Sequence, residues 1–365
     1  MSNTDTRADR GTRGLAPASR AIDRHAPYLR IATEEAWSIP EIVEAQLRLL
    51  ASPRAPDDTS LRMAGMFAKL PALQEQLQDI GEKRIGRMDE LGIDKQLLLL
   101  TAPGVQVLDP DEGTALARLA NDRLAVACRR HPDRFAGLTV FAPQNVKAAV
   151  AEIERGMKTL GMKGAVLNSH TRGHYLDEPA YLPILEALEA NDAALYIHPT
   201  IPPKEWSQPY EFRGMTGALG GFSHEVWVHT MGLILSGAFD RFPKLRLVIG
   251  HMGEGMPLLL YRFDWMQSNA DGRSGLRGGA PPVTLRHPIS YYFKHNIWIT
   301  TSGQGWEPSV KFCMEVLGPD RVLYAMDYPY QQSADECAAY DAFDLSPEHK
   351  KMLMQTNAEW VFRLK

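Results

Sequence analysis

Residues 29–37 read LRIATEEAW, and they form the first of several stretches that decide the fold. The first part is typical of a buried strand, and two adjacent carboxylates, Glu34 and Glu35, then precede Ala36. Successive side chains of a strand point to opposite faces, so the two acids are predicted to have different surroundings. Glu34 is therefore a candidate for chemistry, whereas Glu35 is predicted to be structural.

Seven similar apolar runs follow along the chain. Their continuous rather than alternating hydrophobicity indicates strands covered on both faces, as in parallel sheets. Segments with helical patterns separate them, and several end at Gly or Asn-Asp just before the next strand. Strand–helix alternation repeated eight times predicts an α/β fold, a (β/α)8 TIM-like barrel. The predicted strands lie in residues 29–37, 95–102, 135–142, 163–170, 193–199, 245–251, 296–302 and 321–327.

Two stretches are longer than the repeating unit requires. Residues 38–90 predict a helical insertion after the first strand, and residues 200–223 are rich in Pro and Gly. Long segments after barrel strands lie on the active-site face, so both are candidate substrate loops. Residues 1–27 hold no apolar run that could serve as a secretory signal. We expect them to form a flexible tail, or an arm on a neighbouring subunit, ahead of a single barrel domain over residues 28–365.

Composition narrows the class of protein. The 365 residues are 44% hydrophobic, which is ample for a large core, and the net charge is −4 with no basic stripe. Nucleic acid is therefore not an expected partner. No stretch of about 18 apolar residues occurs, so no membrane span is expected. The three cysteines (Cys128, Cys313 and Cys337) lie far apart without a C-x-x-C pair, which favours a cytoplasmic protein and argues against a thiolate zinc site.

Polar side chains recur where the predicted strands end. In a barrel these carboxyl ends meet at one mouth, where active sites are built. Each residue alone reads as an ordinary hydrogen-bonded group, but their shared position predicts one site. The residues are Glu34, Thr101, His170, His198, His251 and Asp327.

Three of these residues are the candidate metal ligands: Glu34, His198 and Asp327. Oxygen and imidazole donors suit Mn²⁺, Zn²⁺ or Fe²⁺, whereas a structural zinc site would use cysteines. Three protein ligands leave coordination positions open for water and substrate. Asp327 is also a candidate acid, because an acid beside a metal can pass a proton to the reacting atom.

Other residues have both a functional and a structural interpretation. His251, in VIGHMGEG, is either a substrate contact or a structural histidine at a tight turn. Glu225 and His229 share a helix face, where they either orient a ligand or form a buried packing pair. Arg262 is either an anion contact or half of a surface salt bridge. Tyr330 lies three residues after Asp327, where it could cap the site.

The segments IATEEAW, YIHP, VIGHMGEGMP and YAMDYPYQ together resemble the amidohydrolase superfamily, and more narrowly its non-oxidative aromatic acid decarboxylase branch. The resemblance runs from about residue 28 to the end, through LTAPGVQ, SGQGWEPSVKFC and QTNAEWVF. It implies that Glu34, His198 and Asp327 bind the metal.

The resemblance also implies substrate contacts. His251 and Tyr330 match substrate-contacting positions, and Thr101 is assigned with them. Arg262 matches an arginine that reaches in from the adjacent subunit, which implies a homodimer or homotetramer. The family's carboxylate-binding arginine falls near Lys69, with Arg62 close by.

Two departures from the superfamily pattern concern the metal. Ala36 stands where many members carry a second histidine ligand, and the fourth predicted strand ends in residues 168–170 without a lysine to bridge two metals. Both departures imply a single ion. Fewer imidazoles and more oxygen ligands favour Mn²⁺ over Zn²⁺.

The first hypothesis is a carboxy-lyase for an ortho-hydroxylated aromatic acid, 5-carboxyvanillate first and γ-resorcylate next. The phenolate and ortho carboxylate would chelate the metal, and Asp327 would protonate the ring carbon that bears the carboxylate. His251 would contact the phenolic oxygen, supported by Glu225. The second hypothesis is a metal-dependent hydrolase of a lactone or amide on the same barrel. A third, a non-catalytic barrel for binding, predicts no metal.

Overall fold

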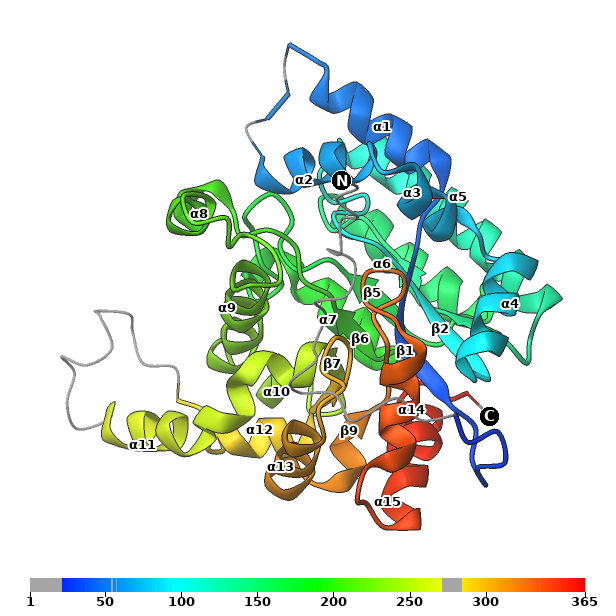
Figure 1. Ribbon diagram of the computed structural model, residues 1–365. Coiled ribbons are helices and arrows are strands. Elements are labelled where there is room, and N and C mark those ends of the chain that lie inside the picture. The colour runs from blue at the N-terminus through cyan, green and yellow to red at the C-terminus, as the bar shows by residue number, and fades with distance from the viewer. Residues whose placement is uncertain (1–21, 54, 57, 271–283, 365) are drawn as a thin grey trace, which may run out of the picture.

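The computed structural model describes residues 22–53, 55–56, 58–270 and 284–364, and its helices surround a central set of strands (Figure 1). Every neighbouring pair of strands is parallel. The strands are β1 (Ile31–Trp37), β2 (Lys95–Leu100), β3 (Phe135–Gly137), β4 (Thr139–Val140), β5 (Ala165–Leu167), β6 (Leu195–Ile197), β7 (Leu247–Ile249), β8 (Ile297–Thr300) and β9 (Val322–Leu323).

The strands close into a barrel. Their order is β1-β2-β3 and β4-β5-β6-β7-β8-β9. The two sets meet within one predicted strand, because only Leu138 separates β3 from β4, and Lys163 N–H still donates to Gly137 O (2.9 Å). On the other side, Thr33 N–H donates to Tyr324 O (3.0 Å) and joins β1 to the chain after β9. The predicted (β/α)8 barrel is confirmed.

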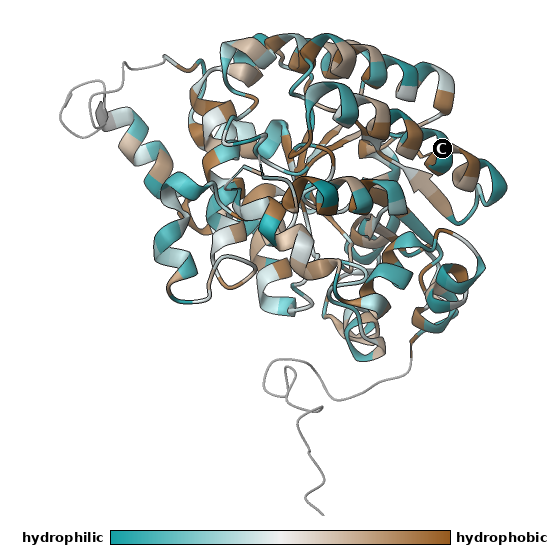
Figure 2. Cartoon of the chain, turned by 90° about the horizontal axis from the view of Figure 1, so that it is seen from above, coloured by the Kyte–Doolittle hydropathy of each residue, from teal (hydrophilic) through white to brown (hydrophobic). Residues whose placement is uncertain are grey.

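The barrel is held by apolar burial on both faces of its strands. Every residue of β1 is buried, and so are the last five residues of β2. Figure 2 shows hydrophobic residues along the central strands and hydrophilic residues mostly on the outer helices. Burying one Leu or Ile side chain contributes about 1.5–3 kcal/mol, so continuous apolar runs specify this position in the fold. The exceptions in β1 are Thr33 and the two acids, and the acids are buried at 1% and 0% exposure.

Helices fill the segments between strands, and local residues set several of their ends. The Asp58 carboxylate caps α2 by accepting from Leu61 N–H (2.9 Å), and α4 ends at Gly92, whose φ of 68° favours glycine. The α-helices are α1 (Pro40–Leu50), α2 (Thr59–Phe67), α3 (Pro71–Gln78), α4 (Glu82–Leu91), α5 (Pro110–Arg130), α6 (Val146–Arg155), α7 (Leu182–Ala190), α8 (Lys204–Glu211), α9 (Gly221–Leu235), α10 (Ala238–Arg241), α11 (Leu260–Ala270), α12 (Ile289–His295), α13 (Glu307–Leu317), α14 (Ala334–Ala342), α15 (Pro347–Lys351) and α16 (Asn357–Val361). Short 3₁₀ or π segments are η2 (Gly156–Leu160), η3 (Pro179–Tyr181), η4 (His251–Leu259), η6 (Pro319–Arg321) and η7 (Met352–Thr356).

The two long segments meet each other. The predicted helical insertion after β1 contains α1, α2, α3 and α4, and the segment after β6 contains α8. Thr59 Oγ1 donates to Pro202 O (2.7 Å), and Thr200 Oγ1 donates to Ser60 Oγ (2.9 Å). The start of α2 is thereby fixed on the segment that follows β6, beside the mouth of the barrel.

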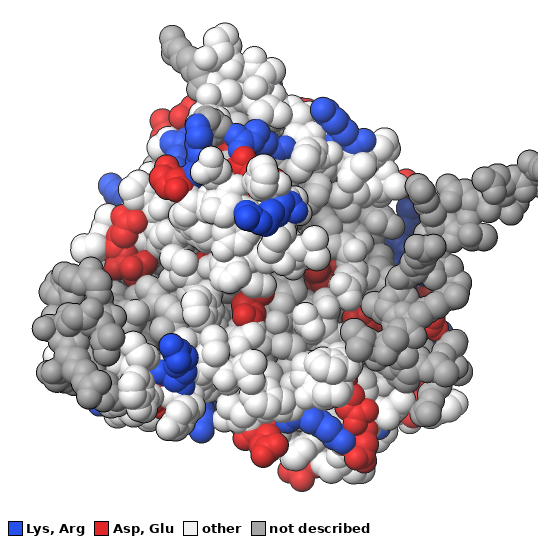
Figure 3. Space-filling view, turned by 60° about the vertical axis from the view of Figure 1, so that its left-hand side comes forward, with Lys and Arg blue, Asp and Glu red and all other residues white. Residues whose placement is uncertain are grey.

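Of the predicted tail, residues 1–27, the first 21 lie outside the described residues. Its last residues contact the barrel: Asp23 N–H donates to Asp341 Oδ2 (2.8 Å), and Arg24 Nη1 donates to Asp89 O (2.9 Å). Within the described ranges, no helix combines the length and apolar character needed to cross a membrane. Basic and acidic side chains are interspersed on the face shown in Figure 3.

Candidate active site

Three strands of the barrel bring together the residues predicted as metal ligands. Glu34 lies in β1, His198 follows β6 and Asp327 follows β9. One ligand atom from each lies within 4.8 Å of the other two. The Nε2 atom of His198 is 3.6 Å from Glu34 Oε1. This separation leaves room for a cation between the side chains.

Glu34 has one satisfied and one unsatisfied oxygen. Its Oε2 accepts hydrogen bonds from Tyr196, from Thr300 Oγ1 (3.0 Å) and from Ser302 Oγ (2.5 Å). Its Oε1 is buried and accepts no hydrogen bond from the described residues. A buried anionic oxygen that accepts no hydrogen bond is costly, even with His251 Nε2 3.4 Å away, so a cation at this point would satisfy it.

The surroundings keep Glu34 ionised and in place. Burial raises its pKa, but the charge of His251 and the hydrogen bonds from Ser302 and Tyr196 oppose burial, and the pKa lies below its ordinary value. A side chain at Gly250 would disturb this arrangement, because its Cβ would lie 2.6 Å from Glu34 Oε2. Glycine at residue 250 therefore lets the backbone approach the carboxylate.

His198 presents the correct ring nitrogen to a metal. Its Nδ1 lies 2.9 Å from Pro199 O and donates to that carbonyl, which leaves the Nε2 lone pair directed at Glu34 Oε1. Burial lowers the pKa of His198 below its ordinary value, which favours the neutral imidazole that binds metals. Two carboxylates and one neutral imidazole fit Mn²⁺, Zn²⁺ or Fe²⁺.

Asp327 occupies a strained backbone conformation. Its φ is 68°, in the left-handed region, which costs on the order of 1 kcal/mol for a residue with a side chain. Its carbonyl accepts from Tyr330 N–H (2.8 Å) and Gln331 N–H (2.9 Å), which closes a tight turn. Burial raises the pKa of its carboxyl above the ordinary value, so the acid form persists to higher pH.

His251 faces the same centre. Its Nε2 is 3.4 Å from Glu34 Oε1 and 3.8 Å from Asp327 Oδ2. Its Nδ1 is 2.7 Å from Glu254 Oε1, which orients the ring. Burial lowers the pKa of His251, but Glu254 and Glu34 outweigh it, and the pKa lies well above its ordinary value. These two carboxylates favour the cationic form of His251, a hydrogen-bond donor beside the candidate ligands.

A cavity of about 600 Å³ opens over these residues, a volume typical of small-molecule sites. Thr101 Oγ1 and the Tyr330 hydroxyl hydrogen-bond at 2.5 Å on its wall, and the Tyr330 and Phe67 rings lie 5.6 Å apart. The walls suit one aromatic ring. The lining residues are Met63, Phe67, Thr101, Ala102, His198, Pro199, Ala218, Phe222, Ser223, His251, Glu254, Gly255, Gly303, Gln304, Asp327, Tyr330 and Gln331.

Glu225 lies in a different buried cluster. Its Oε2 accepts from the Tyr175 hydroxyl (2.8 Å), and its Oε1 accepts from His170 N–H (3.3 Å). On the same helix face, His229 Nε2 accepts from Leu176 N–H (3.1 Å). The carboxylate that holds His251 is Glu254.

Two residues predicted to bind substrate are exposed and are absent from the cavity lining within this chain. Lys69 follows α2, and Arg262 lies in α11. Arg62, the alternative to Lys69, is also exposed and lies 3.2 Å from Glu211. Among the described residues, the cavity wall contains neither lysine nor arginine.

Several functional neighbours are absent from the sequence predictions. Glu254 follows His251 by three residues, in a run from His251 to Gly255 that has positive φ throughout. Tyr196 precedes His198 by two residues, as Thr300 precedes Ser302, so each pair shares one strand face. These spacings are the signals that could have revealed them.

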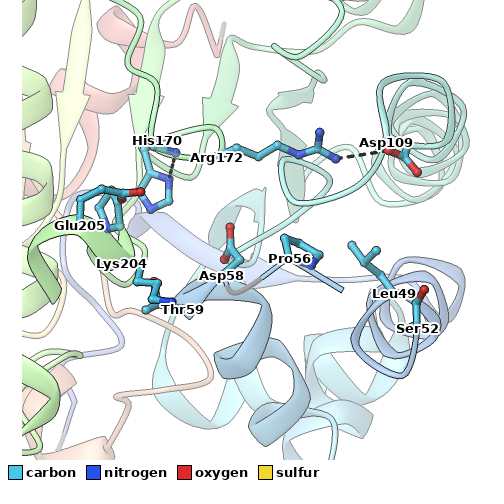
Figure 4. A pocket seen from close by; sticks show the side chains of 12 residues that line it. Leu49, Ser52, Pro56, Asp58, Thr59, Asp109, His170, Arg172, Lys204 and Glu205 are labelled. Carbon is cyan, nitrogen blue, oxygen red and sulfur yellow. Dashed lines mark hydrogen bonds and ion pairs between the residues drawn. The ribbon is translucent and has the colours of Figure 1, made fainter. Parts of the chain in front are cut away.

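A second cavity of about 670 Å³ lies beside His170 and the start of α8 (Figure 4). Its wall mixes charges, and Arg172 and Asp109 approach each other to 3.6 Å. Both ring nitrogens of His170 are hydrogen-bonded, to Ile201 O (3.0 Å) and Gly173 N–H (3.0 Å). This cavity therefore offers no free ligand from His170 and does not contain the three clustered side chains.

Comparisons with known proteins agree with this geometry. A sequence model of a protein family, described as Amidohydrolase, matches residues 23–364 of this chain. The γ-resorcylate decarboxylase of Rhodococcus jostii is 31% identical over 92% of this chain and 98% of its own. A crystal structure of 5-carboxyvanillate decarboxylase from Novosphingobium aromaticivorans matches this chain with a TM-score of 0.89 and 45% identity, over 94% of this chain and 99% of its own. That protein is an aspartate-to-asparagine variant with bound manganese and 3-methoxy-4-hydroxy-5-nitrobenzoic acid. A dihydroxybenzoic acid decarboxylase from Polaromonas, with manganese and 2-nitroresorcinol, has a TM-score of 0.78 and 30% identity over 92% of this chain and 97% of its own.

Proposed function

The chain belongs to the amidohydrolase family, and from this premise we propose that it is a metal-dependent carboxy-lyase of ortho-hydroxylated aromatic acids. The observation that carries the proposal is the buried trio Glu34, His198 and Asp327 beneath a cavity that suits one aromatic ring. Its relatives with high coverage include named decarboxylases of such acids, which favours decarboxylation over hydrolysis of a lactone or amide.

The proposed ligands are Glu34, His198 and Asp327, which would hold one divalent cation, Mn²⁺ first and Zn²⁺ second. Manganese in the related structures supports this choice, as does the unsatisfied Oε1 of Glu34. When bound, the cation supplies positive charge that holds the substrate's phenolate and carboxylate oxygens and reduces their repulsion.

We propose that Asp327 in its acid form donates its proton to the ring carbon that bears the carboxylate. The bond between that carbon and the carboxylate then breaks, CO₂ leaves, and the bonding electrons restore the aromatic ring. A substrate carboxylate beside Asp327 favours the acid form by like-charge repulsion, in addition to burial. His251, oriented by Glu254, donates to the phenolic oxygen, and Thr101 and Tyr330 contact the ring substituents.

The proposed substrate is 5-carboxyvanillate, with γ-resorcylate next, since the named relatives act on these acids. 5-Carboxyvanillate carries a second carboxylate, and within one chain the described cavity wall offers no lysine or arginine to meet it. We propose that Arg262 of a neighbouring subunit supplies this charge, and that Lys69 lies at the edge of the site.

An exposed apolar surface supports a homodimer or homotetramer built around Arg262. Leu258, Tyr261 and Trp265 flank Arg262 along η4 and α11, and they are 73%, 83% and 46% exposed. Large apolar side chains next to an arginine are typical of protein interfaces. Such an interface would bury this surface and direct Arg262 toward the partner's cavity.

The remaining proposals concern the whole chain. One apolar core that extends from Ile31 to Phe362 supports a single barrel domain over residues 28–365. All three cysteines are free thiols, which supports a cytoplasmic location.

The testing experiment is a panel of ortho-hydroxybenzoates, including 5-carboxyvanillate and γ-resorcylate, with metal-free protein reloaded with Mn²⁺ or Zn²⁺. The proposal expects metal-dependent CO₂ release from at least one of these acids. Acid production from a lactone or amide, without CO₂ release from any benzoate, would identify a hydrolase instead.

A further inference from the structure

A chain of buried polar side chains lies behind β1, on the face opposite to Glu34. Arg84 of α4 donates through Nε to Gln96 Oε1 (2.7 Å), and Gln96 Nε2 donates to Glu35 Oε2 (2.9 Å). All three side chains are at most 1% exposed. Apolar side chains would pack a helix on a strand at least as well as buried charges do, so this chain calls for a role beyond packing.

One end of this chain is attached to the backbone beside Asp327. Glu35 Oε1 accepts from Met326 N–H (3.0 Å), directly before the proposed ligand. Glu35 itself follows Glu34, so one residue contacts the backbone next to two ligands. Movement of Glu35 would change the distance between the two ligand segments.

The other end of this chain, Arg84, lies beside Tyr328, which is the neighbour of Asp327 on its other side. Arg84 Nη1 donates to Ala36 O (2.8 Å), and its guanidinium carbon lies 4.2 Å from the centre of the Tyr328 ring. Ala36 N–H in turn donates to Tyr328 O (2.7 Å). Tyr328 follows Asp327, so both neighbours of Asp327 are held by β1 and by the side chains behind it.

This attachment matters because Asp327 has a left-handed backbone conformation, with φ of 68°. Such a conformation persists only where the surroundings fix it. We infer that Arg84, Gln96 and Glu35 are positioning residues, which set the separation of the Glu34 and Asp327 ligands and thereby the affinity of the cation site. The inference rests on the proposed function, because it takes these side chains as metal ligands.

Arg84→Met tests the inference, with Arg246→Met as the matched control. Arg246 is also buried and donates to a backbone carbonyl, Val361 O (3.2 Å), but it lies ahead of β7 at the opposite end of the barrel. The Mn²⁺ dissociation constant of metal-free protein is measured by paramagnetic resonance of free Mn²⁺, together with the thermal unfolding midpoint. Loss of groups that orient ligands typically weakens metal affinity by about 10–100-fold.

We expect Arg84→Met to weaken Mn²⁺ binding by at least about tenfold, while Arg246→Met lowers the unfolding midpoint without changing Mn²⁺ affinity. Equal affinity in Arg84→Met and the parent would overturn the inference, as would an equal loss in Arg246→Met. A parent protein that binds no Mn²⁺ would refute the metal site itself, which is a distinct outcome. If Arg84→Met does not fold, Gln96→Met is measured, and parent-like affinity in that folded variant contradicts the inference.

Discussion

At the scale of single residues, the proposed decarboxylation depends most on Asp327. The carboxyl is close enough to Glu34 and His198 to share a cation with them, and burial raises its pKa toward the acid form. A ligand needs the ionised form and a proton donor needs the acid form. A substrate carboxylate that arrives beside Asp327 would shift the balance toward the acid form as the substrate binds.

Asp327→Asn should retain Mn²⁺ and lose turnover. The amide oxygen can still face the cation, but it carries no proton for the ring carbon, and such a proton transfer typically contributes about 10²–10⁴-fold. The measurement is CO₂ release at saturating substrate, alongside Mn²⁺ content. Asp335→Asn, which changes an exposed acid in α14, serves as the control and should keep parental activity. Substantial CO₂ release by Asp327→Asn would refute the proton-donor role.

At the scale of elements, the strand ends could be predicted from the sequence and the loops could not. A strand that ends in a polar residue fixes where that side chain lies, because barrel geometry brings all carboxyl ends together. His198 and Asp327 follow their strands and meet Glu34 as the sequence predicts, although Glu34 lies in the middle of β1 and not at its end. The contact between His251 and Glu254 depends on the positive-φ turn of η4. The sequence pattern of α9, which contains Glu225, gave no indication that Glu254 makes this contact instead.

Helix α9 should make the fold sensitive to acid through His229. Burial lowers the pKa of His229 to about 3, against about 6.5 in an unfolded chain. Between about pH 3 and about pH 6.5, the unfolded state therefore binds a proton at His229 that the folded state does not bind. The contribution of His229 to stability is complete above about pH 6.5 and falls as the pH decreases toward about 3. His229→Leu should flatten this slope, although the loss of its hydrogen bonds lowers stability at pH 7.

Urea unfolding between pH 7 and pH 4.5 measures this effect as the change in the free energy of unfolding with pH. His224→Gln, at an exposed position of the same helix, should keep the parental slope. An unchanged slope in His229→Leu would show that other groups cause the acid sensitivity.

At the scale of the whole molecule, the barrel brings the three proposed ligands of one chain together but leaves Arg262 outside the cavity wall. Repetition of eight strand–helix units made the barrel predictable, since each unit carries its own hydrophobic signal. The chain of Arg84, Gln96 and Glu35 could not be foreseen in this way. Its members lie up to 61 residues apart, and only the closed barrel places them in contact. Likewise, the proposed action of Arg262 in a neighbouring subunit would leave no signal within its own fold.

A shared site predicts complementation between two inactive variants. Arg262→Ala and Asp327→Asn each remove one part of the site, and a mixed dimer contains one complete site. Co-expression with two affinity tags should recover up to about one quarter of parental activity from random pairing of subunits. In the control pair, His198→Ala with Asp327→Asn, each barrel lacks one member of its own cluster, so no mixed dimer contains a complete site and no activity should be recovered. Absence of recovery in the first pair would contradict a shared site.

The central claim, metal-dependent decarboxylation with protonation of the ring carbon, is tested most directly by nuclear magnetic resonance of the product formed in D₂O. Metal-free protein reloaded with Mn²⁺ would be incubated with 5-carboxyvanillate. We expect CO₂ release only after Mn²⁺ is added, with one deuterium at the carbon that carried the carboxylate. Equal turnover without metal, or a product that keeps both carboxylates, would contradict it.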